Sequence, residues 1–205
     1  MIPYCLFFLV MSVGIPAIAQ DRMPEIPPDK MTEAQRKAVE EFSAERKTPF
    51  RGPFVPLLRS PEVMLNAMRM GTYLRYRNTL PAKLREFAIL ITSRQWTQEF
   101  EWDAHYEIAI KGGLSPEIAK AVADGRRPEG MSDDEDTVYE FSIEVYQNKS
   151  VSDDTYARAL AKFGEQGIID LASLNGYYTF LSMVMNVART PLPKATQPRL
   201  VPFPK

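Results

Sequence analysis

The sequence predicts an all-α protein with one domain, and three observations support this fold class. Apolar residues recur at helical spacing in several segments, capping signals precede many of these segments, and Gly or Pro residues stand at their ends. No segment shows the alternation of apolar and polar residues, bounded by hairpin turns, that is typical of strands. The 205 residues suffice for one domain with a substantial core.

Each expected helix has a signal at its start or its end. Thr32 with Gln35 and Ser132 with Glu135 have the spacing of capping boxes. Other starts carry a Ser or Pro, and several ends carry a Gly. In chain order, the helices are expected to start near Thr32, Ser60, Pro81, Thr97, Ser115, Ser132, Ser152 and Ile168. Their end signals include Arg46, Gly112, Gly125, Gly164 and Ala188.

The segments between and beyond these helices are rich in proline. Residues 20–31 should be an extended leader, and residues 47–59, with three prolines and Gly52, predict no regular helix. The helix from Ile168 to about Ala188 is apolar on two sides, so it should lie in the core or at a subunit interface. Prolines after residue 190 predict a non-helical tail.

The N-terminus has the pattern of an export signal. Residues 6–18 carry no charge and lead into Ala17-Ile18-Ala19, a small-x-small sequence typical of a cleavage site. The run is shorter than the ~20 residues that span a bilayer, so no stable membrane insertion is expected. We expect residues 1–19 to be a signal peptide of an exported (periplasmic or secreted) protein; the alternatives are a short buried segment and a retained anchor. Cleavage would remove Cys5, the only cysteine.

The charge balance excludes one class of partner. The chain has 25 Lys and Arg residues against 26 Asp and Glu residues, and a formal net charge of −1. Because nucleic-acid binding depends on a basic excess that neutralises phosphates, no nucleic-acid partner is expected.

The only histidine, His105, is the leading candidate for chemistry. On the expected helix around residues 97–111, Gln98, Glu101 and His105 share one face. A carboxylate one turn before a histidine can fix its tautomer and raise its pKa, which suits an acid or a base; the alternative is a surface ion pair. One histidine and no cysteine after cleavage are too few ligands for a typical zinc or iron site, so no metal and no cofactor are expected.

Several blocks of sequence, in order along the chain, resemble the carboxymuconolactone decarboxylase and alkylhydroperoxidase D-like superfamily. The blocks are Leu80-Pro-Ala-Lys-Leu-Arg-Glu-Phe-Ala-Ile-Leu, Phe100-Glu-Trp-Asp-Ala-His, Gly113-Leu-Ser-Pro-Glu and the stretch from Gly167 to Tyr178. The resemblance implies an all-α, alkylhydroperoxidase D-like helical bundle over residues 55–193, and a homo-trimer or hexamer. Residues 20–54 would then be a leader with one helix, and residues 194–205 a tail.

The same resemblance narrows the chemistry. Peroxidase members of the superfamily carry a Glu, a Cys-x-x-Cys pair and a His that act together. Glu86 and His105 match the Glu and the His, whereas Gln98 and Glu101 stand at the cysteine positions. Without thiols there is no peroxidatic nucleophile. The resemblance therefore favours the non-redox branch, which includes lactone decarboxylases.

We expect a cofactor-free acid/base enzyme that decarboxylates, opens or isomerises a small organic acid or lactone. His105 would be the base, with Glu101 or Glu86 orienting it. A substrate carboxylate needs a cation or a donor, and we select Gln98, Arg94 and Tyr106 for this role. Other candidates are Arg75, Arg77, Arg85, Tyr73, Tyr139, Tyr177 and Tyr178. The alternatives are a non-catalytic binding or assembly module with the same fold and a peroxidase-like activity without the cysteine pair.

Overall fold

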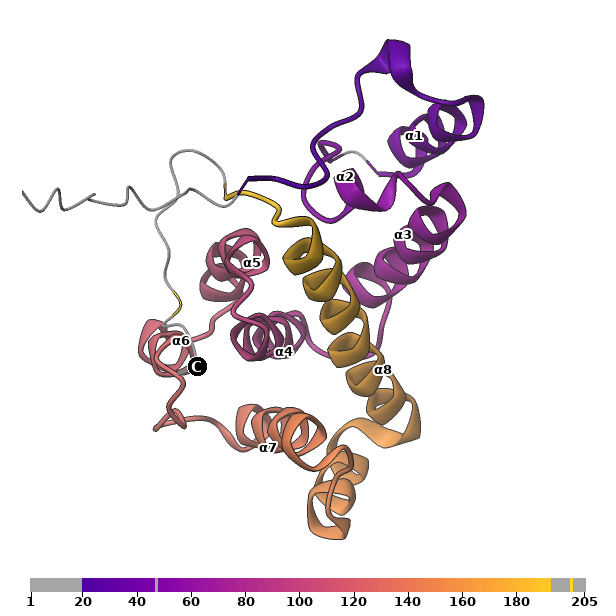
Figure 1. The fold of residues 1–205 in the computed structure, drawn as a ribbon. Helices are drawn as coiled ribbons and strands as arrows, with labels where there is room; N and C mark the ends of the chain where they lie inside the picture. The colour runs from indigo at the N-terminus through magenta and orange to yellow at the C-terminus, as the bar shows by residue number, and fades with distance from the viewer. Residues whose placement is uncertain (1–19, 47, 193–199, 201–205) are drawn as a thin grey trace, which may run out of the picture.

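The computed structural model describes residues 20–46, 48–192 and 200. Within these residues the chain is helical and contains no strand, so the all-α prediction is confirmed (Figure 1). A short 3₁₀ turn, Pro28–Lys30, precedes the helices α1 (Glu33–Glu45), α2 (Phe54–Leu57), α3 (Pro61–Tyr76), α4 (Ala82–Gln95), α5 (Glu99–Lys111), α6 (Pro116–Ala123), α7 (Asp133–Asn148) and α8 (Asp153–Ala188). The signal peptide expected at residues 1–19, and the tail expected at residues 194–205 apart from Leu200, lie outside the described residues.

The predicted helix starts are set by local side chains. Thr32 and Ser132 each form a complete capping box, in which the side chain and backbone of the cap and the third helical residue bond reciprocally. Ser115 and Ser152 also accept hydrogen bonds from the first turns of α6 and α8. The predicted break at Gly164 is confirmed as a kink within α8, where Gly164 has a φ of 66°.

The expectation that residues 47–59 contain no regular helix is wrong for one short turn. Residues Phe54–Leu57 form α2, although Pro53 and Pro56 flank or enter it. Pro53 is the N-cap and Pro56 is the third helical residue. Because the first N–H groups of a helix have no intrahelical partner, proline removes no hydrogen bond at these positions.

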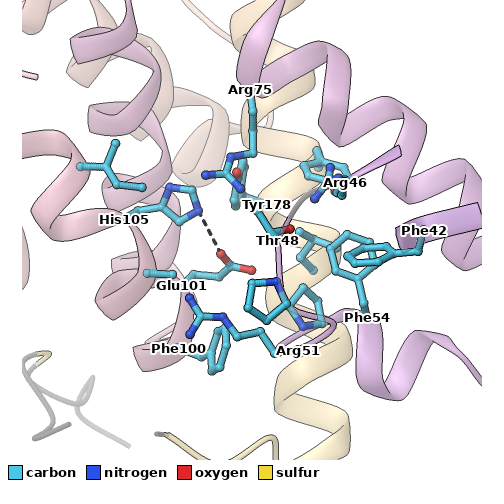
Figure 2. A pocket seen from close by; sticks show the side chains of 16 residues that line it. Phe42, Arg46, Thr48, Arg51, Phe54, Arg75, Phe100, Glu101, His105 and Tyr178 are labelled. Atoms are coloured by element: carbon cyan, nitrogen blue, oxygen red, sulfur yellow. Dashed lines mark ion pairs between the residues drawn. The ribbon is translucent and has the colours of Figure 1, made fainter. Parts of the chain in front are cut away.

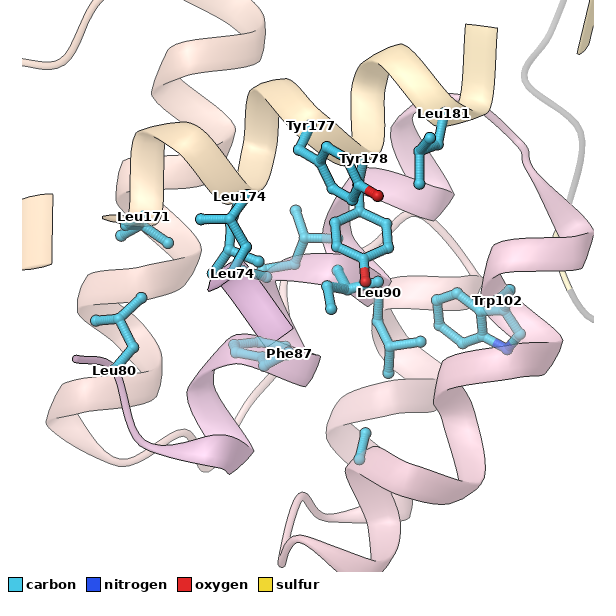
Figure 3. Packing of buried hydrophobic residues seen from close by; sticks show 14 of the residues in the cluster. Leu74, Leu80, Phe87, Leu90, Trp102, Leu171, Leu174, Tyr177, Tyr178 and Leu181 are labelled. Atoms are coloured by element: carbon cyan, nitrogen blue, oxygen red, sulfur yellow. The ribbon is translucent and has the colours of Figure 1, made fainter. Parts of the chain in front are cut away.

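Helix α4 is the centre of the molecule and packs against α5, α6, α7 and α8. Its residues from Glu86 to Arg94 are all buried, so it contacts neighbours on every side. Figure 3 shows Phe87 and Leu90 of α4 facing Leu171, Leu174 and Tyr178 of α8. α8 packs against α4, α7, α3 and α2.

Residues 33–46 and 48–57, which we call the N-terminal arm, comprise α1, α2 and their connection. α1 packs on α3, and α2 packs on both α3 and α8. In Figure 1 the arm lies at the end of the molecule occupied by α3 and the C-terminal part of α8. The arm therefore covers α3 and α8 at this end of the molecule.

Among the described residues, none of the helices is sufficiently long and apolar to cross a membrane.

Candidate active site

Helices α4 and α5 bring the predicted catalytic side chains together. The two helices are joined by Trp96, Thr97 and Gln98 alone, and Thr97 has a positive φ of 45°. A positive φ is unusual for a β-branched residue and marks a sharp turn. The turn folds α5 back along α4, so that Glu101 and His105 of α5 lie next to Glu86 of α4.

His105 lies between the two carboxylates. Its Nδ1 atom is 2.6 Å from Oε2 of Glu86, and its Nε2 atom is 3.4 Å from Oε2 of Glu101. All three residues are at most 7% exposed. The ring of Tyr178 on α8 meets the imidazole edge to face, with ring centroids 5.1 Å apart. Packing and two carboxylates thus fix the orientation of the imidazole.

The surroundings of His105 favour its charged form. Burial alone would lower the pKa of His105, but the contacts with Glu101 and Glu86 and the attraction of both carboxylates outweigh burial and raise this pKa above its usual value. A protonated imidazole donates from both nitrogens, which suits a position between two acceptors. The three residues form a coupled proton-binding cluster, which we call the Glu86–His105–Glu101 cluster.

One carboxylate oxygen of this cluster is unengaged. Oε1 of Glu101 is buried and has no hydrogen-bond partner within the described part of the chain. Buried polar atoms are normally paired, so an unpaired oxygen calls for an explanation such as a catalytic role or a ligand. Glu101 and His105 both line a cavity of about 250 Å³, shown in Figure 2.

The cavity combines cations with aromatic rings. Three arginines line it: Arg46 at the end of α1, Arg51 in the connection after α1, and Arg75 of α3. Glu101 is the one carboxylate among the described lining residues. The aromatic lining residues are Phe42, Phe54, Phe100, Tyr177 and Tyr178. Such a lining suits a small molecule with a negative charge and an apolar body.

Arg75 is the cation associated with the cluster. Burial alone would lower its pKa, but Tyr178, Tyr76 and the carboxylates of Glu86 and Glu101 outweigh burial and raise the pKa above its usual value. Its Nε atom is buried without a hydrogen-bond partner among the described residues. Figure 2 shows its guanidinium reaching from α3 into the region of His105 and Tyr178. Arg75 therefore offsets the negative charge of the two carboxylates.

The two tyrosines of α8 remain neutral donors. Burial raises the pKa of Tyr178 well above its usual range, and burial also raises the pKa of Tyr177 to about 12. Both hydroxyls therefore keep their protons at physiological pH. Tyr177 and Tyr178 line the same cavity as His105, so each can donate a hydrogen bond to an oxygen atom of a ligand.

The structure brings together three of the six expected site residues and places the other three elsewhere. Gln98 caps α5 through the N–H of Phe100 and donates to Asn186 of α8, at 2.7 Å. Arg94 lies against Gly125 after α6. Tyr106 borders a different cavity, beside Trp102 and Lys120. Gln98, Arg94 and Tyr106 are not among the residues that line the cavity with His105.

Sequence patterns do not predict that residues of the arm border the cavity. Arg46 ends a helix and Arg51 lies in a proline-rich connection, so neither belongs to a helical pattern that predicts its direction. Arg75, Tyr177 and Tyr178 belong to the wider set of candidates, because their spacing does not distinguish them from core or surface residues. Only the packing of α1 and α2 against α3 and α8 brings these side chains together.

No group of three or more His, Cys, Asp and Glu side chains in the described residues is arranged to hold a metal ion.

Part of the chain matches a known family. Residues 61–136 match the sequence model of the carboxymuconolactone decarboxylase family. The matched region runs from the start of α3 into the first turn of α7 and contains Glu86, Glu101 and His105. The resemblance noted from the sequence is confirmed over these residues, and it agrees with an alkylhydroperoxidase D-like helical fold. No curated protein matches the chain. The N-terminal arm lies outside the matched region.

Proposed function

Because residues 61–136 carry the carboxymuconolactone decarboxylase family pattern together with the whole Glu86–His105–Glu101 cluster, we propose that the protein is an acid/base enzyme acting on a small organic acid or lactone. The observation that carries the proposal is the unpaired Oε1 of Glu101, in a buried cluster that borders a cation-lined cavity. The reaction class is decarboxylation, ring opening or isomerisation without redox chemistry.

The three residues of the cluster take different roles in this proposal. Both nitrogens of His105 face carboxylates, so a substrate in the cavity meets the cluster through Oε1 of Glu101. Glu101 takes a proton from the substrate or returns one to it. His105, held by Glu86, donates to Glu101 and adjusts its basicity as the proton moves. His105 thus supports the base that touches the substrate, rather than reaching the substrate directly.

The cavity supplies the other requirements of such a reaction. Negative charge that develops on a carboxylate or an enolate needs donors that are already in place. Arg75 and the hydroxyls of Tyr177 and Tyr178 border the same space as Glu101. A volume of about 250 Å³ lies below the usual range for drug-sized ligands, which favours a substrate of few heavy atoms.

The test is turnover of a panel of small carboxylic acids and lactones by variants of the cluster. We expect Glu101→Gln and His105→Ala to lose roughly 100-fold or more in kcat, the scale of general acid/base catalysis. Glu129→Gln is the matched control, because Glu129 is an exposed carboxylate outside the cavity lining. Circular dichroism confirms that each variant is folded.

Two outcomes would contradict the proposal. Equal turnover by His105→Ala and the parent protein would show that the cluster does no chemistry. Saturable binding of a panel member without turnover, at every pH tested, would instead support a binding or assembly module with this fold.

A further inference from the structure

The charges that line the cavity do not balance. Of the charged lining residues outside the arm, Arg75 supplies one positive charge and Glu101 supplies one negative charge, whereas Glu86 contacts His105 and does not line the cavity. Arg46 and Arg51 of the N-terminal arm also line the cavity, and no further carboxylate borders it among the described residues. The arm therefore gives the cavity a surplus of two positive charges, which a ligand can neutralise.

The side chain of Arg46, the first of these two cations, is held by contacts with the protein. Its Nη2 atom donates to the backbone oxygen of Met68 at 3.0 Å, and its guanidinium lies 5.0 Å from the ring centroid of Phe54. It is 8% exposed and makes no ion pair within the described residues. Arg46 thus places a buried positive charge beside the cavity, but part of its N–H groups already bond to the protein.

Arg51 has a fixed backbone but an available side chain. The next residue, Gly52, has a φ of 63°, and a Cβ atom there would lie 2.4 Å from the ring of Phe100. This close approach holds the connection of the arm against the start of α5, beside Glu101. The Arg51 side chain is exposed and has no hydrogen bond or ion pair with a described residue. Figure 2 shows it on the same side of the cavity as Phe100 and Glu101.

We propose that the N-terminal arm determines substrate specificity, and that Arg51 binds an anionic group of the substrate at the exposed edge of the cavity. The inference rests on the proposed function, which assigns the reacting atom of the substrate to the position facing Glu101. The substrate is then a small acid whose apolar body lies against Phe54 and Phe100. Its carboxylate points toward Arg51 and its reacting atom toward Glu101. Arg75 is left to compensate the cluster.

Equilibrium binding tests this inference without any need for turnover. The probes are acetate, butyrate and benzoate, each measured by isothermal titration calorimetry beside its neutral amide. We expect at least one acid to bind more tightly than its amide. Arg51→Gln should weaken the binding of that acid by about fivefold and leave its amide unchanged, because a partly exposed charge pair contributes modestly.

Lys37→Gln is the matched control. Lys37 is an exposed cation on the same arm, paired with Glu33 and outside the cavity lining. Lys37→Gln and Arg51→Gln each remove one positive charge, so an effect of net charge alone would appear in both variants. Gly52→Ala is the second variant. It removes no charge, yet it should weaken acid binding because the connection must shift away from Phe100.

Three results would overturn the inference: equal binding of every acid and its amide, no binding of any acid, or unchanged acid binding in Arg51→Gln. These outcomes are separable from failure of the proposed function. Full turnover by His105→Ala contradicts the catalytic proposal and leaves the binding data untouched. Unchanged acid affinity in Arg51→Gln contradicts only the role of the arm.

Discussion

At the scale of single residues, His105 differs from a surface histidine in that both of its nitrogens face buried carboxylates. Glu86 lies 2.6 Å from one nitrogen and Glu101 lies 3.4 Å from the other. Burial of an isolated imidazolium is costly, but two adjacent carboxylates reverse the balance and raise the pKa. The two carboxylates therefore determine the pKa of His105, and the pH dependence of stability tests this effect.

The raised pKa of His105 predicts how stability depends on pH. A group whose pKa is higher in the folded chain than in the unfolded chain, where it is about 6.5, stabilises the fold fully below that value. This contribution is lost as the pH rises through the folded pKa. We expect the free energy of unfolding, measured with urea, to fall above pH 6.5 more steeply in the parent protein than in His105→Gln. His105 is the only histidine, so identical pH profiles would contradict the prediction.

At the scale of elements, α1, α3 and α8 meet at Gly71. A Cβ atom on this residue of α3 would lie 2.2 Å from the Tyr177 hydroxyl and 2.7 Å from Nη2 of Arg46. Glycine inside a helix usually costs up to about 1 kcal/mol relative to alanine. Here it lets a cation of the arm and a hydroxyl of α8 approach α3, where both border the cavity.

Gly71→Ala should therefore destabilise the protein, although alanine is the better helix former. We expect a loss of about 1–3 kcal/mol in the free energy of unfolding, as is typical of overpacking. Binding of small acids should weaken as Arg46 and Tyr177 shift. Gly176→Ala in α8 is the control, because a Cβ atom at this position would have no neighbouring atom within 4 Å. This variant should stabilise the monomer slightly. A stabilised Gly71→Ala variant would contradict this account.

At the scale of the whole molecule, the candidate site combines residues inside the region that matches a family model with residues outside it. The cluster lies in the region that matches a known family, and the surplus cations lie in the arm outside it. A second feature at this scale is a set of exposed apolar side chains on α3 and α8. They include Val63, Met70, Ile169, Met183 and Val187.

These side chains bear on the oligomer that the family resemblance implies, which stays a prediction. Exposed apolar residues that cluster on neighbouring helices often mark an interface. We expect sedimentation velocity to show a trimer or hexamer, and Ile169→Glu with Val187→Glu to shift the protein toward the monomer. A parent protein that sediments as a monomer at all concentrations would contradict the prediction. Exposed Glu129→Lys is the control for a change of charge.

Features that depend on residues close together along the chain can be predicted without the structure. Capping pairs such as Thr32 with Gln35 and Ser132 with Glu135 set helix starts, because their hydrogen bonds span three residues. The spacing of Glu101 and His105 on one helix was likewise readable, and a family resemblance added Glu86. By contrast, the positions of Arg94 and Tyr106 outside the cavity of His105, and of Arg46 and Arg51 in its lining, depend on how the helices pack. The physical reason is that the arm and α8 meet by packing across long distances in sequence. No local periodicity encodes which side chains face the space left between them.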